Sequence, residues 1–126
     1  MTDLQAIGML ENKFGNRLQQ QVPLKNFATA RVGGMAAWLV TVRNIDELVE
    51  VVQICWDHQL KFFLLGAGSN ILFSDEGFDG LVILNHAKKI EIKISGEHPT
   101  LWVESGANLG LVARKAALAG LSGLEW

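Results

Sequence analysis

The sequence has a single cysteine and no cluster of charges of one sign. Of its 126 residues only Cys55 is a cysteine, which excludes an internal disulfide. Its 11 basic and 13 acidic residues give a formal net charge of −2, and neither sign forms a block that would follow a phosphate backbone. We therefore expect a soluble cytoplasmic protein that does not bind nucleic acid.

Long apolar runs and metal-ligand spacings are also missing. No run approaches the roughly 20 residues that span a bilayer, and Asp3 stands where a secretory signal would be basic. The three histidines, His58, His86 and His98, lie far apart with no second cysteine to complete a metal site. We expect neither a membrane segment nor a bound metal, and no histidine is placed to form a catalytic triad.

The length and the 49% hydrophobic composition match one globular domain with one core. Residues 1–22 carry apolar side chains at intervals of three and four, which predicts an amphipathic helix. Pro23 closes this segment. Gly33 and Gly34 indicate a loop ahead of a strand over 37–42.

A capping box marks the clearest helix. Asn44 can cap it, Glu47 follows three residues later, and the helix is predicted to run to about His58. Its apolar face is predicted to consist of Ile45, Leu48, Val49, Val52 and Trp56. Cys55 lies on or beside that face, which favours a core thiol over a nucleophile.

The second half of the chain reads mainly as strands. The stretch "KFFLLG" (61–66) is typical of a short, fully buried strand, and "GLVILN" (80–85) of another. The stretches "KIEIKIS" (89–95) and "TLWVESG" (100–106) flank a polar turn, which predicts an antiparallel hairpin with one buried face. Asn108 can cap a final helix that Gly120 ends. This order predicts an α+β (α/β-like) fold.

The loop after the first buried strand, "LLGAGSNILFSD" (64–75), has the composition of a phosphate cradle. Glycines let backbone N–H groups converge on phosphate oxygens, and Ser69 and Asn70 can add donors. A Walker loop is excluded because no lysine lies between Lys61 and Lys88, and Ile71 replaces the third glycine of a dinucleotide fingerprint. Spacing alone leaves a capped glycine turn equally open.

A second loop, "ESGANLG" (104–110), also joins a strand to a helix N-terminus. Two such loops can hold the two phosphates of a dinucleotide. Taken alone, Gly106 is more simply read as a turn into the helix. The acidic residues Asp75, Glu76 and Asp79 are better read as a solvated loop than as a carboxylate site.

Four segments, in this order and spacing, resemble one known family. They are "TARVGGMA" (29–36), "LLGAGSNILFSDEGFDGLVI" (64–83), "VESGANLGLV" (103–112) and "GLSGLEW" (120–126). Together they are similar to the N-terminal part of the MurB-type UDP-N-acetylenolpyruvoylglucosamine reductases, also called UDP-N-acetylmuramate dehydrogenases. The resemblance implies an FAD-binding domain of the vanillyl-alcohol-oxidase/PCMH type. It also implies that the FAD pyrophosphate lies against Gly66, Ala67, Gly68, Ser69 and Asn70, with Gly106 and Ala107 as a second contact.

The family's reaction implies the rest of the function. NADPH reduces the flavin, which delivers hydride to UDP-N-acetylglucosamine enolpyruvate and yields UDP-N-acetylmuramate for peptidoglycan synthesis and cell division. The UDP-sugar is thus the expected partner of the whole enzyme. Ala30 and Met35 depart from the family's usual aromatic and proline, and Ala67 occupies a variable position, all of which are tolerable packing changes.

The resemblance also predicts an incomplete domain. Residues 1–22 would be a helical or irregular lead, and residues 23–126 part of an FAD-binding domain without its substrate domain or any catalytic residue. We expect such a fragment to be inactive alone, to retain FAD weakly and to associate through Leu121, Leu124 and Trp126. Two alternatives stay open: a non-catalytic nucleotide-phosphate binding module, and a structural domain whose glycines only make turns.

Overall fold

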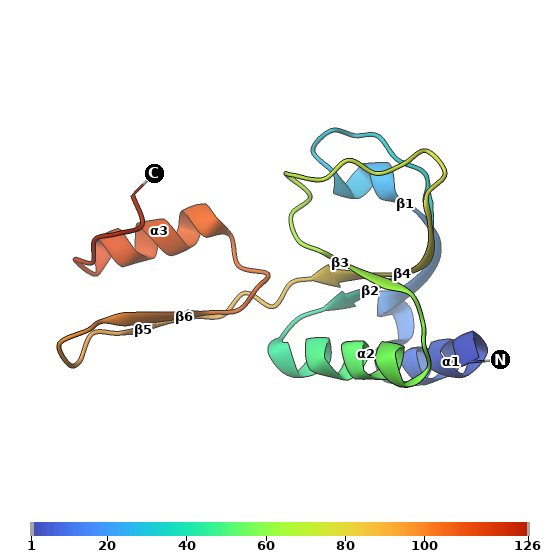
Figure 1. Ribbon diagram of the computed structural model, residues 1–126, viewed down its shortest axis with the longest axis horizontal. Coiled ribbons are helices and arrows are strands. Elements are labelled where there is room, and N and C mark those ends of the chain that lie inside the picture. Colours follow the sequence, from blue (N-terminus) through green and yellow to red (C-terminus); the bar gives the residue numbers. More distant parts are fainter. Residues whose placement is uncertain (1, 126) are drawn as a thin grey trace.

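The computed structural model describes residues 2–125, and its elements follow the order shown in Figure 1. They are α1 (Thr2–Phe14), β1 (Leu18–Pro23), β2 (Met35–Val42), α2 (Ile45–Asp57), β3 (Phe62–Leu65), β4 (Phe78–Asn85), β5 (Ile90–Lys93), β6 (Thr100–Val103) and α3 (Leu109–Leu118). Two short 3₁₀ turns, at Gly15–Arg17 and Leu24–Phe27, flank β1. None of the helices within residues 2–125 combines the length and apolar character needed to cross a membrane.

Four of the strands form one mixed sheet in the order β1-β2-β4-β3. The strand β1 pairs antiparallel with β2, whereas β2, β4 and β3 run parallel, so that the carboxyl ends of these three strands lie at one edge. A separate antiparallel hairpin, β5–β6, lies beyond that edge together with α3 (Figure 1). We call residues 2–85 the sheet body and residues 90–118 the hairpin module.

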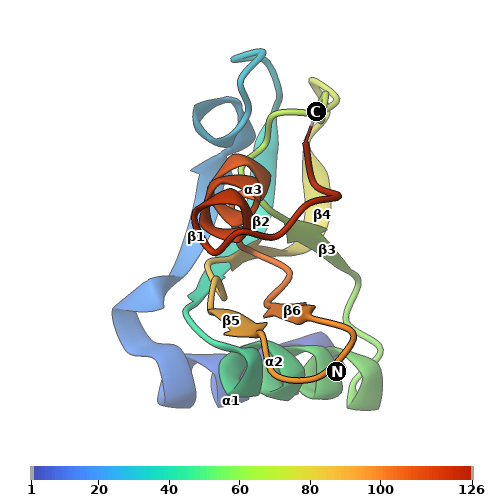
Figure 2. The same cartoon turned by 90° about the vertical axis from the view of Figure 1, so that its left-hand side faces the viewer.

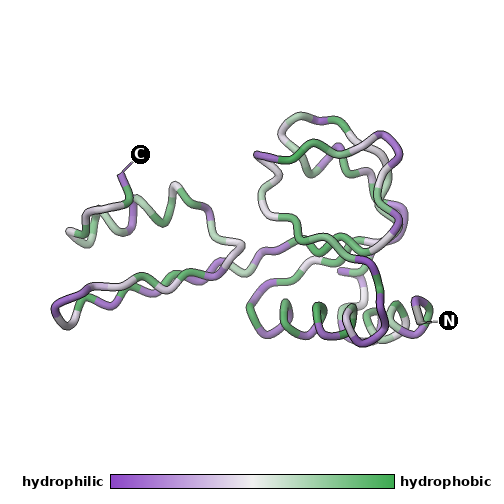
Figure 3. Tube along the Cα trace, viewed as in Figure 1, coloured by the Kyte–Doolittle hydropathy of each residue, from purple (hydrophilic) through white to green (hydrophobic). Residues whose placement is uncertain are grey.

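The sheet body is covered on both faces. Helices α1 and α2 lie on one face, and the loops before β2 and after β3 lie on the other (Figure 2). The helical side buries Leu10, Phe14, Val40, Val42, Val51, Ile54, Leu81 and Ile83, and the loop side buries Leu24, Leu39, Leu65, Val82 and Leu84. Apolar residues accordingly concentrate where the strands cross the body (Figure 3).

The helix predicted over 1–22 is wrong in its second part. The helix ends at Phe14, Gly15 takes φ +53°, and Leu18–Pro23 becomes the edge strand β1. Apolar spacing misled because Leu18 continues the helical period, while pairing with β2 supplies hydrogen bonds that outweigh that local preference. The helix that does form buries Ala6, Ile7 and Leu10 against the body.

The capping of α2 is confirmed, but its apolar face was predicted only in part. The backbone N–H of Glu47 donates to Asn44 Oδ1 at 2.9 Å. The side that faces the sheet carries Leu48 as predicted, and Val52 is partly buried against the core. It also carries Val51, Ile54 and Cys55, while the predicted Ile45, Val49 and Trp56 are 38%, 59% and 67% exposed. Because apolar residues occur around most of this helix, periodicity alone does not select the face that meets the sheet.

The predicted core thiol is confirmed. Cys55 is 1% exposed, and burial raises its pKa to about 11. The sulfur is therefore protonated at neutral pH and unsuited to nucleophilic chemistry.

The strand β3 exists where predicted but is not fully buried. Phe63 and Leu64 are 37% and 46% exposed, because β3 is an edge strand at the end of the sheet order. The β5–β6 hairpin is confirmed, yet its expected buried face is only half-buried at Ile90 and Ile92. The Asn108 cap of α3 is confirmed by the bond from Leu111 N to Asn108 Oδ1 at 2.9 Å.

Candidate functional site

The loop 66–70 follows the carboxyl end of β3, on the side of the sheet that faces the hairpin module (Figure 1). Gly68 is buried with φ +75°, and a Cβ there would overlap the carbonyl group of Phe27. Its carbonyl oxygen accepts a hydrogen bond from Thr29 N at 3.0 Å. Only glycine fits this position without strain, so Gly68 seats the loop on residues 27–29.

The rest of this loop presents free backbone groups. Ala67, Ser69 and Asn70 are exposed, and within residues 2–125 their N–H groups find no backbone acceptor. A Cβ built on Gly66 meets no atom within 4 Å. Open space beside several unpaired N–H groups fits a phosphate, because oxygen atoms of an anion can approach the backbone closely there.

Three further glycines hold residues 73–77, which continue this loop toward β4, against the segment before β2, and their role was not predicted from the sequence. Gly34 N donates to Ser74 O at 2.8 Å, and Gly77 N donates to the same oxygen at 3.0 Å. A Cβ on Gly33 would press on the Phe73 side chain, and one on Gly34 or Gly77 would meet backbone. The "GG" pair before β2 was the sequence feature that could have predicted this contact, because two residues without side chains allow the loops before β2 and before β4 to pack directly against each other.

The second loop is built differently. Gly106 N donates to Ala87 O at 2.7 Å, and Ala107 N donates to Glu104 O at 3.0 Å, so both N–H groups are already engaged. A Cβ on Gly106 would meet the carbonyl oxygens of Asn85 and Ala87. Gly106 is thus needed for the turn itself, and any contact of this loop with a ligand is by close approach of its backbone rather than by donation from these two amides.

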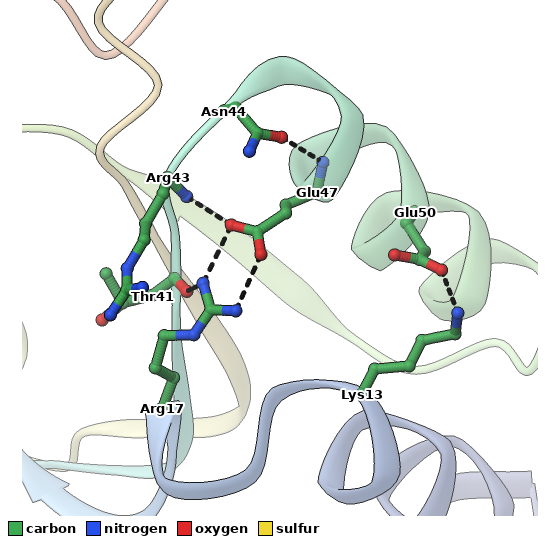
Figure 4. Close-up of polar contacts among 7 residues, drawn as sticks. All are labelled: Lys13, Arg17, Thr41, Arg43, Asn44, Glu47 and Glu50. Atoms are coloured by element: carbon green, nitrogen blue, oxygen red, sulfur yellow. Dashed lines mark hydrogen bonds and ion pairs between the residues drawn. The ribbon is translucent and has the colours of Figure 1, made fainter.

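The most extensive charged network among the described residues lies at the start of α2 (Figure 4). Arg17 donates to both carboxylate oxygens of Glu47, at 2.8 and 2.7 Å, and Arg43 N donates to Glu47 Oε1 at 2.8 Å. The hydrogen bond from Arg17, followed by that from Arg43 N, holds the pKa of Glu47 below its usual range. A second ion pair joins Lys13 and Glu50. These bonds fasten α1 and its following turn to α2.

Other candidate groups stay dispersed. Asp75 and Glu76 are exposed in the loop before β4, as predicted, whereas Asp79, also exposed, belongs to β4 itself rather than to a loop. Within residues 2–125 no three histidine, cysteine or acidic side chains gather in a way that would hold a metal ion.

The arrangement of parallel strands, covering helices and adjoining hairpin is shared with enzymes of known structure. Cholesterol oxidase from Brevibacterium sterolicum superposes with a TM-score of 0.60 at 13% identity, over 81% of this chain and 20% of that one. p-Cresol methylhydroxylase superposes with a TM-score of 0.59 at 21% identity, over 95% and 25%. The fold is therefore the vanillyl-alcohol-oxidase/PCMH-type FAD-binding fold.

Sequence comparison then gives the family. The model of the family described as "FAD binding domain" matches residues 36–125. The chain belongs to this FAD-binding domain family, and the fold class expected from the sequence is confirmed.

Within this family the chain is similar to enzymes named UDP-N-acetylenolpyruvoylglucosamine reductase. It is 33% identical to the UDP-N-acetylenolpyruvoylglucosamine reductase of Chlamydia trachomatis serovar D over 117 residues, which is 93% of this chain and 39% of that protein. It is 38% identical to that of Caldicellulosiruptor saccharolyticus over 82% of the chain and 33% of the protein. The Thermus caldophilus enzyme, MurB, superposes with a TM-score of 0.63 at 36% identity, over 86% and 36%. The resemblance to MurB-type reductases is confirmed, and the chain spans less than two fifths of these relatives' length.

Proposed function

We propose that this chain forms part of the FAD site of a MurB-like reductase, with the loop 66–70 against the FAD pyrophosphate. The observation that carries the proposal is the loop itself: a glycine-seated turn at the carboxyl end of a parallel strand that presents the N–H groups of Ala67, Ser69 and Asn70. The carboxyl edge of parallel strands is where open α/β sheets bind ligands. The similarity to enzymes named as reductases supports FAD as the bound nucleotide.

The residues divide the work as follows. The loop amides would donate hydrogen bonds to the pyrophosphate oxygens, and the exposed side chains of Ser69 and Asn70 would add donors. Gly106 and Ala107 bring a second stretch of backbone close to the cofactor from the hairpin module. Bound FAD supplies the hydride chemistry, while the protein supplies position and electrostatics.

The finer activity is also a proposal. By likeness to the curated relatives, the whole protein would use NADPH to reduce UDP-N-acetylglucosamine enolpyruvate in cytoplasmic peptidoglycan synthesis. The competing function is a nucleotide-phosphate binding module, which uses the same loop without redox chemistry. The two functions differ in the relative affinity for FAD and ADP. A flavin site gains affinity from the isoalloxazine ring, whereas a phosphate-binding module does not.

The test is a titration of the isotope-labelled chain with FAD, ADP and adenosine, followed by NMR because the binding is expected to be weak. A valine at Gly66 would add bulk beside the loop amides, at a position where a Cβ meets no atom within 4 Å. We expect Gly66→Val to weaken FAD binding roughly tenfold or more. The control is Gly8→Val on α1, where a Cβ likewise meets nothing within 4 Å.

The outcomes separate the readings. Shifts of the Ala67, Ser69 and Asn70 amides by both FAD and ADP, but not by adenosine, support the phosphate cradle. ADP binding as tightly as FAD favours the non-catalytic module. Equal FAD affinity in the Gly66→Val and Gly8→Val variants would remove the loop from the site.

A further inference from the structure

Glu104 is a buried acid at the end of β6. It is 6% exposed, and Asn85 is the other buried polar side chain within the described part of the chain. A carboxylate removed from water needs strong hydrogen bonds to remain stable. Its surroundings therefore indicate what it does.

The carboxylate accepts hydrogen bonds from two distant backbone segments. Glu104 Oε2 accepts from Ile45 N at 3.0 Å, and Oε1 accepts from Lys89 N at 2.8 Å. Ile45 is the first residue of α2, where unpaired N–H groups and the helix dipole favour a negative charge. Lys89 immediately precedes β5, and its carbonyl oxygen also accepts from Glu104 N at 2.9 Å.

These bonds lie where the sheet body meets the hairpin module. The neighbouring Asn85, the last residue of β4, donates to Ser105 Oγ at 2.8 Å and accepts from Ala87 N at 3.1 Å. Gly106 and Ala107 lie two and three residues after Glu104, and Ala107 N donates to the Glu104 carbonyl. One side chain thus joins the start of α2, the link into β5 and the turn into α3.

We propose that Glu104 is the positioning residue that fixes the hairpin module, and with it Gly106 and Ala107, against the carboxyl edge of the sheet. The protein's own carboxylate also occupies the N-terminus of α2, which is the anion-binding position after β2. Because that position is already occupied, the loop 66–70 is the place where a ligand phosphate can bind. The part of this inference that concerns a ligand rests on the proposed FAD site; the part that concerns the two segments does not.

The first arm of the test needs no ligand. We expect Glu104→Ala to speed amide hydrogen exchange at Ile45, Lys89 and Gly106 at least about tenfold. Glu104→Gln should give a smaller change, because one amide oxygen can still accept one of the two bonds. The controls are Glu97→Ala and Glu97→Gln in the exposed turn of the hairpin. Exchange at Thr29, which bonds the loop 66–70, should stay unchanged in all four variants.

The second arm measures FAD affinity in the same variants by the NMR titration. We expect a several-fold loss in Glu104→Ala and none in Glu97→Ala. Unchanged exchange at Ile45 and Lys89 would overturn the proposal, and equal acceleration at Thr29 and throughout β4 would reduce Glu104 to a general structural role. Accelerated local exchange with unchanged FAD affinity would overturn the ligand part alone. If the unsubstituted chain bound no FAD, the proposed function would fail while the exchange arm still decided the positioning role.

Discussion

The sheet body and the hairpin module are stabilised in different ways. In the body, strand residues such as Leu81 and Ile83 have no exposed surface, and helices or loops cover both faces of the sheet. Among residues 90–125 the buried side chains are only those of Glu104, Val112 and Ala116. The body therefore carries its own hydrophobic core, whereas the module depends on backbone pairing and on polar bonds at its junction with the body.

The largest difference is expected from truncating equivalent isoleucines in the two regions. Ile83→Ala removes buried methyl groups from the centre of β4 and should lower the free energy of unfolding by about 3–4 kcal/mol. Ile92→Ala in β5 removes a half-exposed side chain and should cost less than about 1 kcal/mol. Urea unfolding followed by circular dichroism measures both. Similar costs for the two variants would contradict the contrast between the regions.

The same contrast applies to ion pairs. Arg17 and Glu47 are paired through two bonds, with side chains 24% and 21% exposed, whereas Lys89 and Glu91 form one bond with side chains 62% and 43% exposed. Glu47→Gln should cost about 1–2 kcal/mol at pH 7, because it weakens charge-assisted bonds to Arg17. Glu91→Gln should leave unfolding unchanged within error, since water screens the exposed pair. A clear cost for Glu91→Gln would show that the hairpin is less open than described.

The Glu47 pair also predicts a pH dependence. The folded-state pKa of Glu47 lies below its unfolded value of 4.5, chiefly because Arg17 donates to it. As the pH falls, the unfolded chain takes up this proton first, so the contribution of Glu47 is complete above pH 4.5 and is lost as the pH falls through the folded-state pKa. The difference in the free energy of unfolding between the unsubstituted chain and Glu47→Gln should therefore become smaller as the pH is lowered from about 5 to about 2–3. A constant difference over that range would exclude the ion pair as its source.

Local signals were enough to predict much of this fold. The caps at Asn44 and Asn108 and the β5–β6 turn depend on a few adjacent residues, and each is found where expected. Residues 18–23, and three of the five residues predicted to face the core from α2, were mispredicted because both depend on partners distant in sequence, namely β2 and the sheet. The prediction that β3 is fully buried was wrong for the same reason, since a sequence does not reveal which strand lies at the edge of the sheet.

The candidate site divides in the same way. The glycine pattern of residues 66–70 is readable because the backbone needs it locally, and Gly68 does take a positive φ. The supporting contacts of Gly34 with residues 74–77, and the bonds of Glu104 to Ile45 and Lys89, join segments far apart in the chain. A single sequence carries no signal for such pairings, so these residues emerge only from the structure.

The smallest effect is expected on the outer surface of α3. Leu118 is 80% exposed, so Leu118→Gln should change the free energy of unfolding by no more than about 0.5 kcal/mol. In the same helix, Val112 is 5% exposed, and Val112→Ala should cost about 1–2 kcal/mol. Thermal unfolding of both variants measures these costs, and light scattering measures whether the chain associates. A cost above about 1 kcal/mol for Leu118→Gln, together with a smaller particle size, would mean that a second copy of the chain covers α3 in solution and supplies the core that the hairpin module lacks.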